Sequence, residues 1–149
     1  MGKYAAAVDD HLVIPARALL SQGQEQVLRL LGRTVPKGVG VRLIIDTGSK
    51  RTALVPWVLD QLSPPLMDNV RVETSTGDLH TGLFWVRLDF PDTGLSSIPA
   101  IAVARIPLPP SVQAFHGLLG RDLLRRMEYL FYQGRKQRLA IRDRPWWRF

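Results

Sequence analysis

The sequence contains no cysteine. This excludes disulfides, thiol nucleophiles and cysteine-based zinc or iron–sulfur sites. The chain also has no apolar run of the roughly 20 residues that a transmembrane helix needs. Its first residues reach two aspartates before any apolar stretch of signal-peptide length. We therefore expect a cytoplasmic protein with no membrane partner.

Motifs for metals, cofactors and covalent catalysis are missing as well. The three histidines, His11, His80 and His116, do not have the spacing of a metal site. The glycines before residue 41 fit neither a dinucleotide-binding nor a phosphate-binding loop, and no G-x-S-x-G motif occurs. We expect neither a metal nor a cofactor.

Acidic residues are scarce, with 13 Asp and Glu against 20 Lys and Arg, so the formal net charge is +7. The positive residues are densest after Gly120. Such a surface can attract nucleic acid, anionic lipid or acidic peptides. No nucleic-acid-binding module accompanies the charge. We favour a solvated basic face and keep a basic nucleic-acid-binding β domain as an alternative.

The length of 149 residues suits one domain, residues 1–149, with its own core. Twelve glycines and 11 prolines indicate many turns and favour short strands over long helices. A segment at residues 25–31 fits a helical turn or a strand equally well. The other elements expected from the pattern are strands at 39–45 and 98–106, a strand and short helix within 52–62, hairpins at 70–90 and 130–141, and a helix at 121–129.

Two short segments carry the chemistry. The first is Leu43-Ile44-Ile45-Asp46-Thr47-Gly48-Ser49, in which an apolar strand ends at an acidic residue. A carboxylate at the end of a buried strand is costly unless it is hydrogen-bonded or shares a proton. Glycine two positions later lets backbone amides approach that carboxylate. The second is Leu118-Leu119-Gly120-Arg121-Asp122-Leu123-Leu124.

In their order and spacing these segments, with a glycine-tipped hairpin between them, resemble the retropepsin-type aspartic proteases over residues 39–141. The resemblance implies a mostly β, closed β-barrel with one short helix in the C-terminal half. It also implies a homodimer that hydrolyses peptide bonds as an aspartic endopeptidase, with no metal and no covalent intermediate.

The resemblance implies roles for individual residues around the first segment. Asp46 would be the catalytic carboxylate. Thr47 would brace the two active-site loops against each other, and Gly48 would contact the substrate backbone. Ser49 would form a hydrogen bond near Asp46.

Two further groups would surround this loop. Thr76 and Gly77 would form the tip of a flap that closes over an extended peptide. Leu118, Leu119 and Gly120 would support the loop from beneath. The walls of the flanking pockets are expected to be apolar, with Leu54, Val55 and residues 107–110 as candidates.

The chemistry requires two carboxylates that share one proton, because two like charges about 3 Å apart cannot both ionise. One well-placed Asp-Thr-Gly implies that a second copy of the chain supplies the other carboxylate. The sequence contains another Asp-Thr-Gly, Asp92-Thr93-Gly94, which follows Pro91 and is interpreted as a turn.

One departure from the family pattern concerns charge. Retroviral members usually carry an acidic residue two positions after the glycine of the first segment, and it pairs with an arginine at the position of Arg121. Here that position is Lys50. Asp122 is one possible replacement partner for Arg121.

A second departure concerns the dimer. The segment before the first strand is longer than in the compact viral enzymes. The resemblance therefore does not assign the strands of the terminal dimer sheet. The C-terminal residues 144–149, RPWWRF, are candidates for it. A catalytically silent dimerisation or peptide-binding module with the same fold is the main alternative function.

Overall fold

The computed structural model describes residues 3–7, 11–74, 77–133 and 138–143. The strands are β1 (Lys3–Ala7), β2 (Val13–Leu19), β3 (Val39–Ile45), β4 (Ala53–Leu54), β5 (Leu66–Thr74), β6 (Gly77–Asp89), β7 (Ile98–Arg105), β8 (Gly117–Leu119), β9 (Met127–Gln133) and β10 (Arg138–Asp143). The helices are α1 (Gln22–Leu30), α2 (Pro56–Leu62), the 3-10 helix η1 (Pro110–Val112) and α3 (Arg121–Leu124). Within these ranges no helix is long and apolar enough to span a bilayer.

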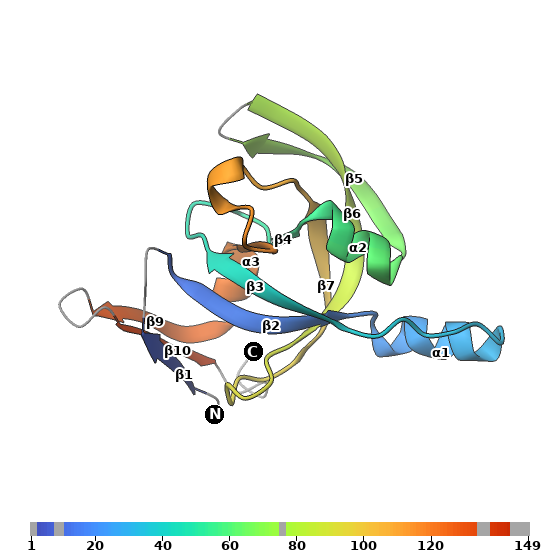
Figure 1. The fold of residues 1–149 in the computed structure, drawn as a ribbon, viewed down its shortest axis with the longest axis horizontal. Coiled ribbons are helices and arrows are strands. Elements are labelled where there is room, and N and C mark those ends of the chain that lie inside the picture. Colours follow the sequence, from blue (N-terminus) through green and yellow to red (C-terminus); the bar gives the residue numbers. More distant parts are fainter. Residues whose placement is uncertain (1–2, 8–10, 75–76, 134–137, 144–149) are drawn as a thin grey trace.

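The strands form two sheets (Figure 1). The larger has the order β2-β3-β8-β4-β7-β6-β5, and β2 also pairs with β6, so six strands form a closed circuit of pairings. The smaller has the order β1-β10-β9. The mostly β prediction is confirmed. The closed barrel stays a prediction, which the pairing of β2 with β6 supports.

The core follows from alternation along the strands. In β3 the exposure alternates from Val39 onward, so Val41, Leu43 and Ile45 point inward. Leu139 and Ile141 of β10 belong to the same buried cluster. The small sheet therefore packs on the core of the larger one.

Three predicted elements are confirmed. The hairpin β5–β6 pairs Thr74 with Gly77 at its end, and the hairpin β9–β10 occupies the predicted terminal position. Helix α2 begins with Pro56 in its first turn, where the missing amide costs nothing. The expected flap residue Thr76 lies outside the described residues, as do residues 144–149.

The short helix expected in the C-terminal half is α3 (Arg121–Leu124), and the described residues contain two further α-helices, α1 and α2. The segment at 25–31, for which the sequence allowed a helical turn or a strand, lies in α1 and its C-cap. Ser21 caps the start of α1 by accepting a hydrogen bond from the Gln24 amide (3.2 Å). The predicted helix at 121–129 ends at Leu124. From Met127 the chain pairs with β10 instead, so long-range strand pairing overrides the local helical spacing.

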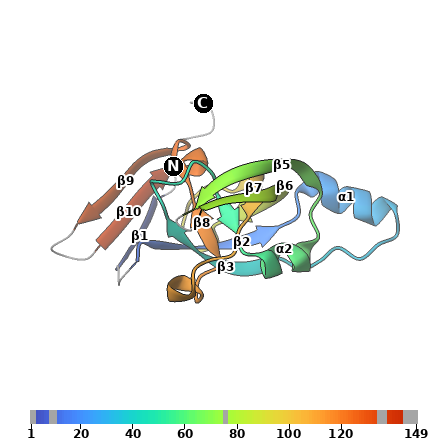
Figure 2. The ribbon, with the colours of Figure 1, turned by 90° about the horizontal axis from the view of Figure 1, so that it is seen from above.

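The end of the β5–β6 hairpin and the loop after β3 lie on the same side of the molecule (Figures 1 and 2). Helix α1 projects from the opposite side in both views. Helix α1 is therefore well separated from the loop after β3.

Candidate active site

The Asp46 loop begins where β3 and β8 end together. These strands are parallel and pair Ile45 with Leu119. The Asp46 amide continues the ladder by donating to the carbonyl of Leu119 (3.0 Å). Asp46 thus lies at the end of two buried strands and is itself half-buried.

The turn after Asp46 holds its carboxylate. The Gly48 amide donates to Asp46 Oδ1 (2.9 Å). A Cβ built at Gly48 would lie 3.3 Å from that same oxygen, which is tighter than an ordinary contact. Glycine therefore leaves room for the carboxylate beside the amide that binds it, and a larger residue would press on Oδ1.

Thr47 and Ser49 occupy the exposed and inner sides of this turn. Thr47 is exposed, and among the described residues its hydroxyl has no hydrogen-bond partner. The Ser49 amide donates to the Asp46 carbonyl (3.2 Å), whereas its hydroxyl donates to the carbonyl of Arg51 (2.8 Å). Ser49 therefore contacts the Asp46 backbone and not its carboxylate.

Leu118, Leu119 and Gly120 lie next to the strands and loop that carry Asp46. Leu119 is fully buried, and Leu118 pairs with Ala53 of β4. A Cβ at Gly120 would lie 2.5 Å from the carbonyl of Arg51. Only glycine permits this backbone contact, so Gly120 lets the second segment pack directly against the Asp46 loop.

A buried hydrogen-bond network joins the two segments, and sequence reasoning missed its central residue, Thr52. The Thr52 hydroxyl donates to Asp122 Oδ1 (2.7 Å) and accepts from the Gly120 amide (3.1 Å). The Asp122 carboxylate also accepts from the amides of Thr52 (3.0 and 2.9 Å) and Leu123 (2.8 Å). Thr52 is fully buried. The signal available in the sequence was the position of Thr52, a polar residue directly before an apolar run.

Because of this network, Asp122 does not serve as the partner of Arg121. Asp122 binds Thr52 and not Arg121, and Arg121 is exposed with no ion pair to any described residue. The backbone performs the connection instead. The Arg121 amide donates to the carbonyl of Ser49 (2.9 Å) and the Asp122 amide donates to that of Lys50 (3.2 Å).

The second Asp-Thr-Gly is a turn, as predicted. Asp92 and Gly94 have φ values of +61° and +74°. The Thr93 hydroxyl donates to the carbonyl of Phe90 (2.6 Å) and accepts from the Leu95 amide (3.1 Å). This closes the turn on itself.

At the hairpin end, Gly77 has a φ of +123°, which side chains rarely adopt. The Thr74 hydroxyl donates to the Gly77 carbonyl (2.6 Å). A shallow hollow of about 520 Å³ lies along β5 and β6, lined by Asn69, Val70, Arg71, His80, Thr81 and Gly82. It contains no residue of the Asp46 loop.

The prediction that Leu54 and Val55 line the flanking pockets is wrong. Leu54 and Val55 are 0% and 7% exposed and belong to the core. They pack beneath the site because β4 pairs with both β7 and β8. Residues 107–110 lead into η1 and are mostly exposed, so they remain candidates.

His116 lies close to β3 and forms a polar contact with it. Its Nδ1 accepts a hydrogen bond from the Arg42 amide (2.8 Å), which requires that nitrogen to be unprotonated. Burial, and then the charge of Arg42, lower the pKa of His116. Its ring also meets Trp57 edge-on (5.4 Å between centroids). Within the described ranges no three His, Asp or Glu side chains lie together as metal ligands.

Comparison with known proteins gives one kind of match. No family model matches the sequence, and no curated protein matches it. Among solved structures, the chain is similar to a retropepsin-like aspartic protease from Rickettsia conorii, with a TM-score of 0.55 and 16% sequence identity. The match covers 94% of this chain and 90% of that one. The likeness shows that this chain has the retropepsin-like fold.

Proposed function

We propose that the protein is an aspartic endopeptidase whose active site is completed by a second copy of the chain. Each protomer contributes Asp46, and the two carboxylates share one proton across the two-fold axis. The observation that carries the proposal is the position of Asp46. It lies at the end of buried β3, with Oδ1 held by the Gly48 amide (2.9 Å), in a chain with the retropepsin-like fold.

The need for a second copy follows from the other carboxylates. Asp122 is engaged by Thr52 and Leu123, and Asp92 belongs to a separate turn. Among the described residues, Asp46 is therefore the one carboxylate available on this loop. The exposed Thr47 lies next to it, where it can brace the loop of a partner.

The reaction follows from the shared proton. The ionised carboxylate removes a proton from water, and the resulting hydroxide adds to the peptide carbonyl carbon. The protonated carboxylate donates to the carbonyl oxygen as its negative charge develops. The tetrahedral intermediate then collapses and its C–N bond breaks. The leaving nitrogen takes the proton that the first carboxylate removed from water, and the second carboxylate regains a proton from a hydroxyl of the intermediate, which restores the shared proton.

The substrate is an extended peptide. The β5–β6 hairpin ends on the same side of the molecule as the Asp46 loop (Figure 1). A peptide between them can add backbone hydrogen bonds to a strand edge. Gly77, at the described end of the hairpin, and Thr76 form the proposed flap tip. Because these contacts are to backbone, they allow several peptide sequences.

The test is a peptide-library digest with wild type beside Asp46→Asn, with and without a statine-type inhibitor. Wild type should cleave, the inhibitor should block cleavage, and the variant should be folded and inactive. A folded, active Asp46→Asn would contradict the proposal. Binding of peptides by both proteins without cleavage would indicate a silent binding module. Salt-sensitive retention on DNA without cleavage would favour a nucleic-acid-binding domain.

The shared site predicts a further result on mixing. When wild type and Asp46→Asn are unfolded and refolded together in equal amounts, about a quarter of random dimers carry two intact carboxylates. Activity should fall to that fraction of the value for the same total amount of wild-type protein. Retention of half the activity would show that each chain works alone.

A further inference from the structure

Helix α1 exposes an unusual amount of aliphatic surface at its end. Leu30 is 80% exposed, Leu31 63% and Val27 47%. We refer to these three side chains as the α1 tip. At 3.6 residues per turn, Leu30 lies on the side of the helix opposite Leu28, which packs against the core. Leu30 therefore faces away from the protein, and the exposed fractions of Leu31 and Val27 place these two side chains in solvent as well.

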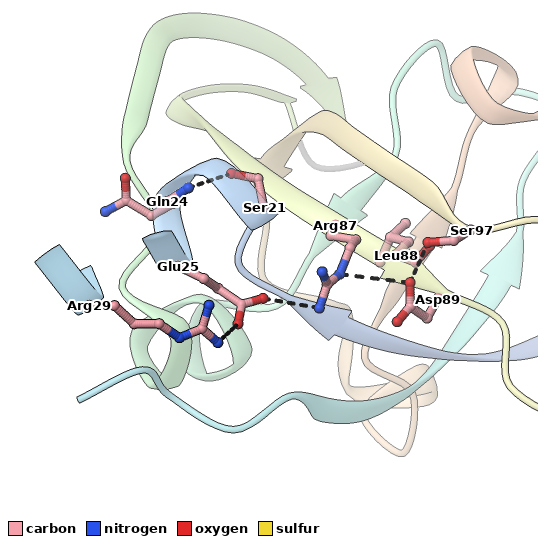
Figure 3. A network of polar contacts seen from close by, with 8 residues as sticks. All are labelled: Ser21, Gln24, Glu25, Arg29, Arg87, Leu88, Asp89 and Ser97. Atoms are coloured by element: carbon pink, nitrogen blue, oxygen red, sulfur yellow. Dashed lines mark hydrogen bonds and ion pairs between the residues drawn. The ribbon is translucent and has the colours of Figure 1, made fainter. Parts of the chain in front are cut away.

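The helix is anchored, so this exposure is a fixed feature. An isolated helix of nine residues is marginal in water. Here Ser21 caps it, and Glu25 pairs with Arg87 of β6 (3.0 Å) (Figure 3). The side chains of Glu25 and Arg87 are only 14% and 15% exposed. This largely buried ion pair holds α1 against the sheet and its tip toward solvent.

The charges beside the α1 tip are positive. Arg33 and Lys37 are exposed and have no ion pair with any described residue. The one acidic residue between positions 21 and 40 is Glu25, which is already paired with Arg87 and with Arg29 (3.2 Å). The apolar surface is thus followed by two uncompensated cations, Arg33 shortly after it and Lys37 on the segment that returns to β3. An anionic surface complements this arrangement.

We propose that the α1 tip docks the protein on the surface of a bilayer that contains anionic lipids. Val27, Leu30 and Leu31 enter the boundary between headgroups and acyl chains, while Arg33 and Lys37 contact lipid phosphates. The sequence predicts no membrane partner because it lacks a spanning segment and an apolar stretch of signal-peptide length, but a helix at the membrane surface needs neither. This helix would lie on the membrane and not cross it.

The shape of the surface favours lipid over a protein partner. The α1 tip is the end of a projection (Figure 2), and it consists of three side chains. Stable protein interfaces bury about 1,200–2,000 Å² and pack complementary surfaces. A bilayer deforms around a small apolar projection and requires no matching pocket.

The first test is co-sedimentation of the full chain with vesicles. One set contains phosphatidylcholine and phosphatidylglycerol, the other phosphatidylcholine alone. Wild type should bind the anionic vesicles. Leu30→Ser with Leu31→Ser should lower the partition coefficient about tenfold or more. Arg33→Gln with Lys37→Gln should lower it about 30-fold on anionic vesicles.

Matched controls separate this surface from general properties of the chain. Leu66 and Met67 are 56% and 48% exposed on β5, so Leu66→Ser with Met67→Ser removes a comparable apolar surface elsewhere. Arg125 is exposed at the end of α3, an element that lies far from α1 in Figure 1, and it gives the charge control Arg125→Gln. Both should bind like wild type. Melting temperatures should change little for all variants, because each altered side chain is exposed.

The absence of cysteine permits a direct test of insertion. Leu30→Cys and Met67→Cys each place one environment-sensitive fluorophore at a known position. The label at position 30 should shift to shorter wavelength on anionic vesicles, and the label at position 67 should not.

Three results would overturn the proposal. Wild type fails to bind anionic vesicles, or the α1 variants bind as tightly as the controls. Alternatively, Leu30→Ser with Leu31→Ser changes the sedimentation coefficient without vesicles, which would make this surface an interface between copies of the chain.

Discussion

Replacement of Thr52 by valine tests the network that joins the Asp46 loop to β8 and α3. Valine has nearly the shape of threonine but lacks the hydroxyl. In the structure that hydroxyl is fully buried, donates to Asp122 (2.7 Å) and accepts from the Gly120 amide (3.1 Å). Thr52→Val therefore removes two hydrogen bonds and leaves little cavity.

The size of the effect follows from these contacts. The Gly120 amide would be buried without a partner, which costs about 1–3 kcal/mol. The Asp122 carboxylate would lose one charge-assisted bond, which contributes about 1.5–3 kcal/mol, but would keep its bonds from backbone amides. We expect the free energy of unfolding to fall by about 3 kcal/mol. For a chain of this size that lowers Tm by about 6–12 °C.

Urea unfolding and calorimetry measure this change at one fixed protein concentration, because the stability of the proposed dimer would depend on concentration. Thr52→Ser keeps the hydroxyl and should lose about 1 kcal/mol for the missing methyl group. Thr34 is exposed, so Thr34→Val should be silent within about 0.5 kcal/mol. A loss below about 1 kcal/mol for Thr52→Val would refute the assigned role of the hydroxyl.

Three further predictions concern the site and its surroundings. Gly48→Ala should lower kcat on the order of tenfold with little loss of stability, since its Cβ would press on Asp46 Oδ1 at 3.3 Å; unchanged peptidase kinetics would contradict this. Asp92→Asn should leave cleavage unchanged, because Asp92 belongs to a separate turn; a folded but inactive variant would reassign the catalytic residue. The pKa of His116 is lowered in the folded state, so the unfolded chain binds more protons and the free energy of unfolding should fall as pH drops below about 6.5. His116→Gln should flatten that slope in urea unfolding at several pH values, with the loss of the bond from Arg42 also lowering stability at neutral pH.

Several elements could be predicted because their signals are local. The alternation before Asp46 identifies β3, and Pro56 marks the first turn of α2. The helix expected at 121–129 shows the limit of this reasoning. Leu123 and Met127 have helical spacing, but Met127 pairs with a strand from the C-terminal part of the chain. Strand pairing is non-local, and spacing within nine residues does not report it.

The residues that precede them also distinguish the two Asp-Thr-Gly triplets. The one at Asp46 follows buried strand residues, whereas Pro91 precedes the one at Asp92. Nothing local, however, indicates that Thr52 joins Gly120 to Asp122, since the hydrogen bonds cross about 70 residues. For the same reason the sequence could not show that the ion pair considered between Arg121 and Asp122 does not form.

By itself the amino-acid sequence determined the strand that ends at Asp46, the glycine that lets an amide reach its carboxylate, and the order of segments typical of the fold. These depend on residue size and on period-two alternation, which act over a few positions. Only the tertiary structure decided which polar groups are satisfied and which apolar groups remain in water. Thr52 is buried and Leu30 is exposed, against the usual preference of each residue type, because burial depends on contacts between segments distant in the chain.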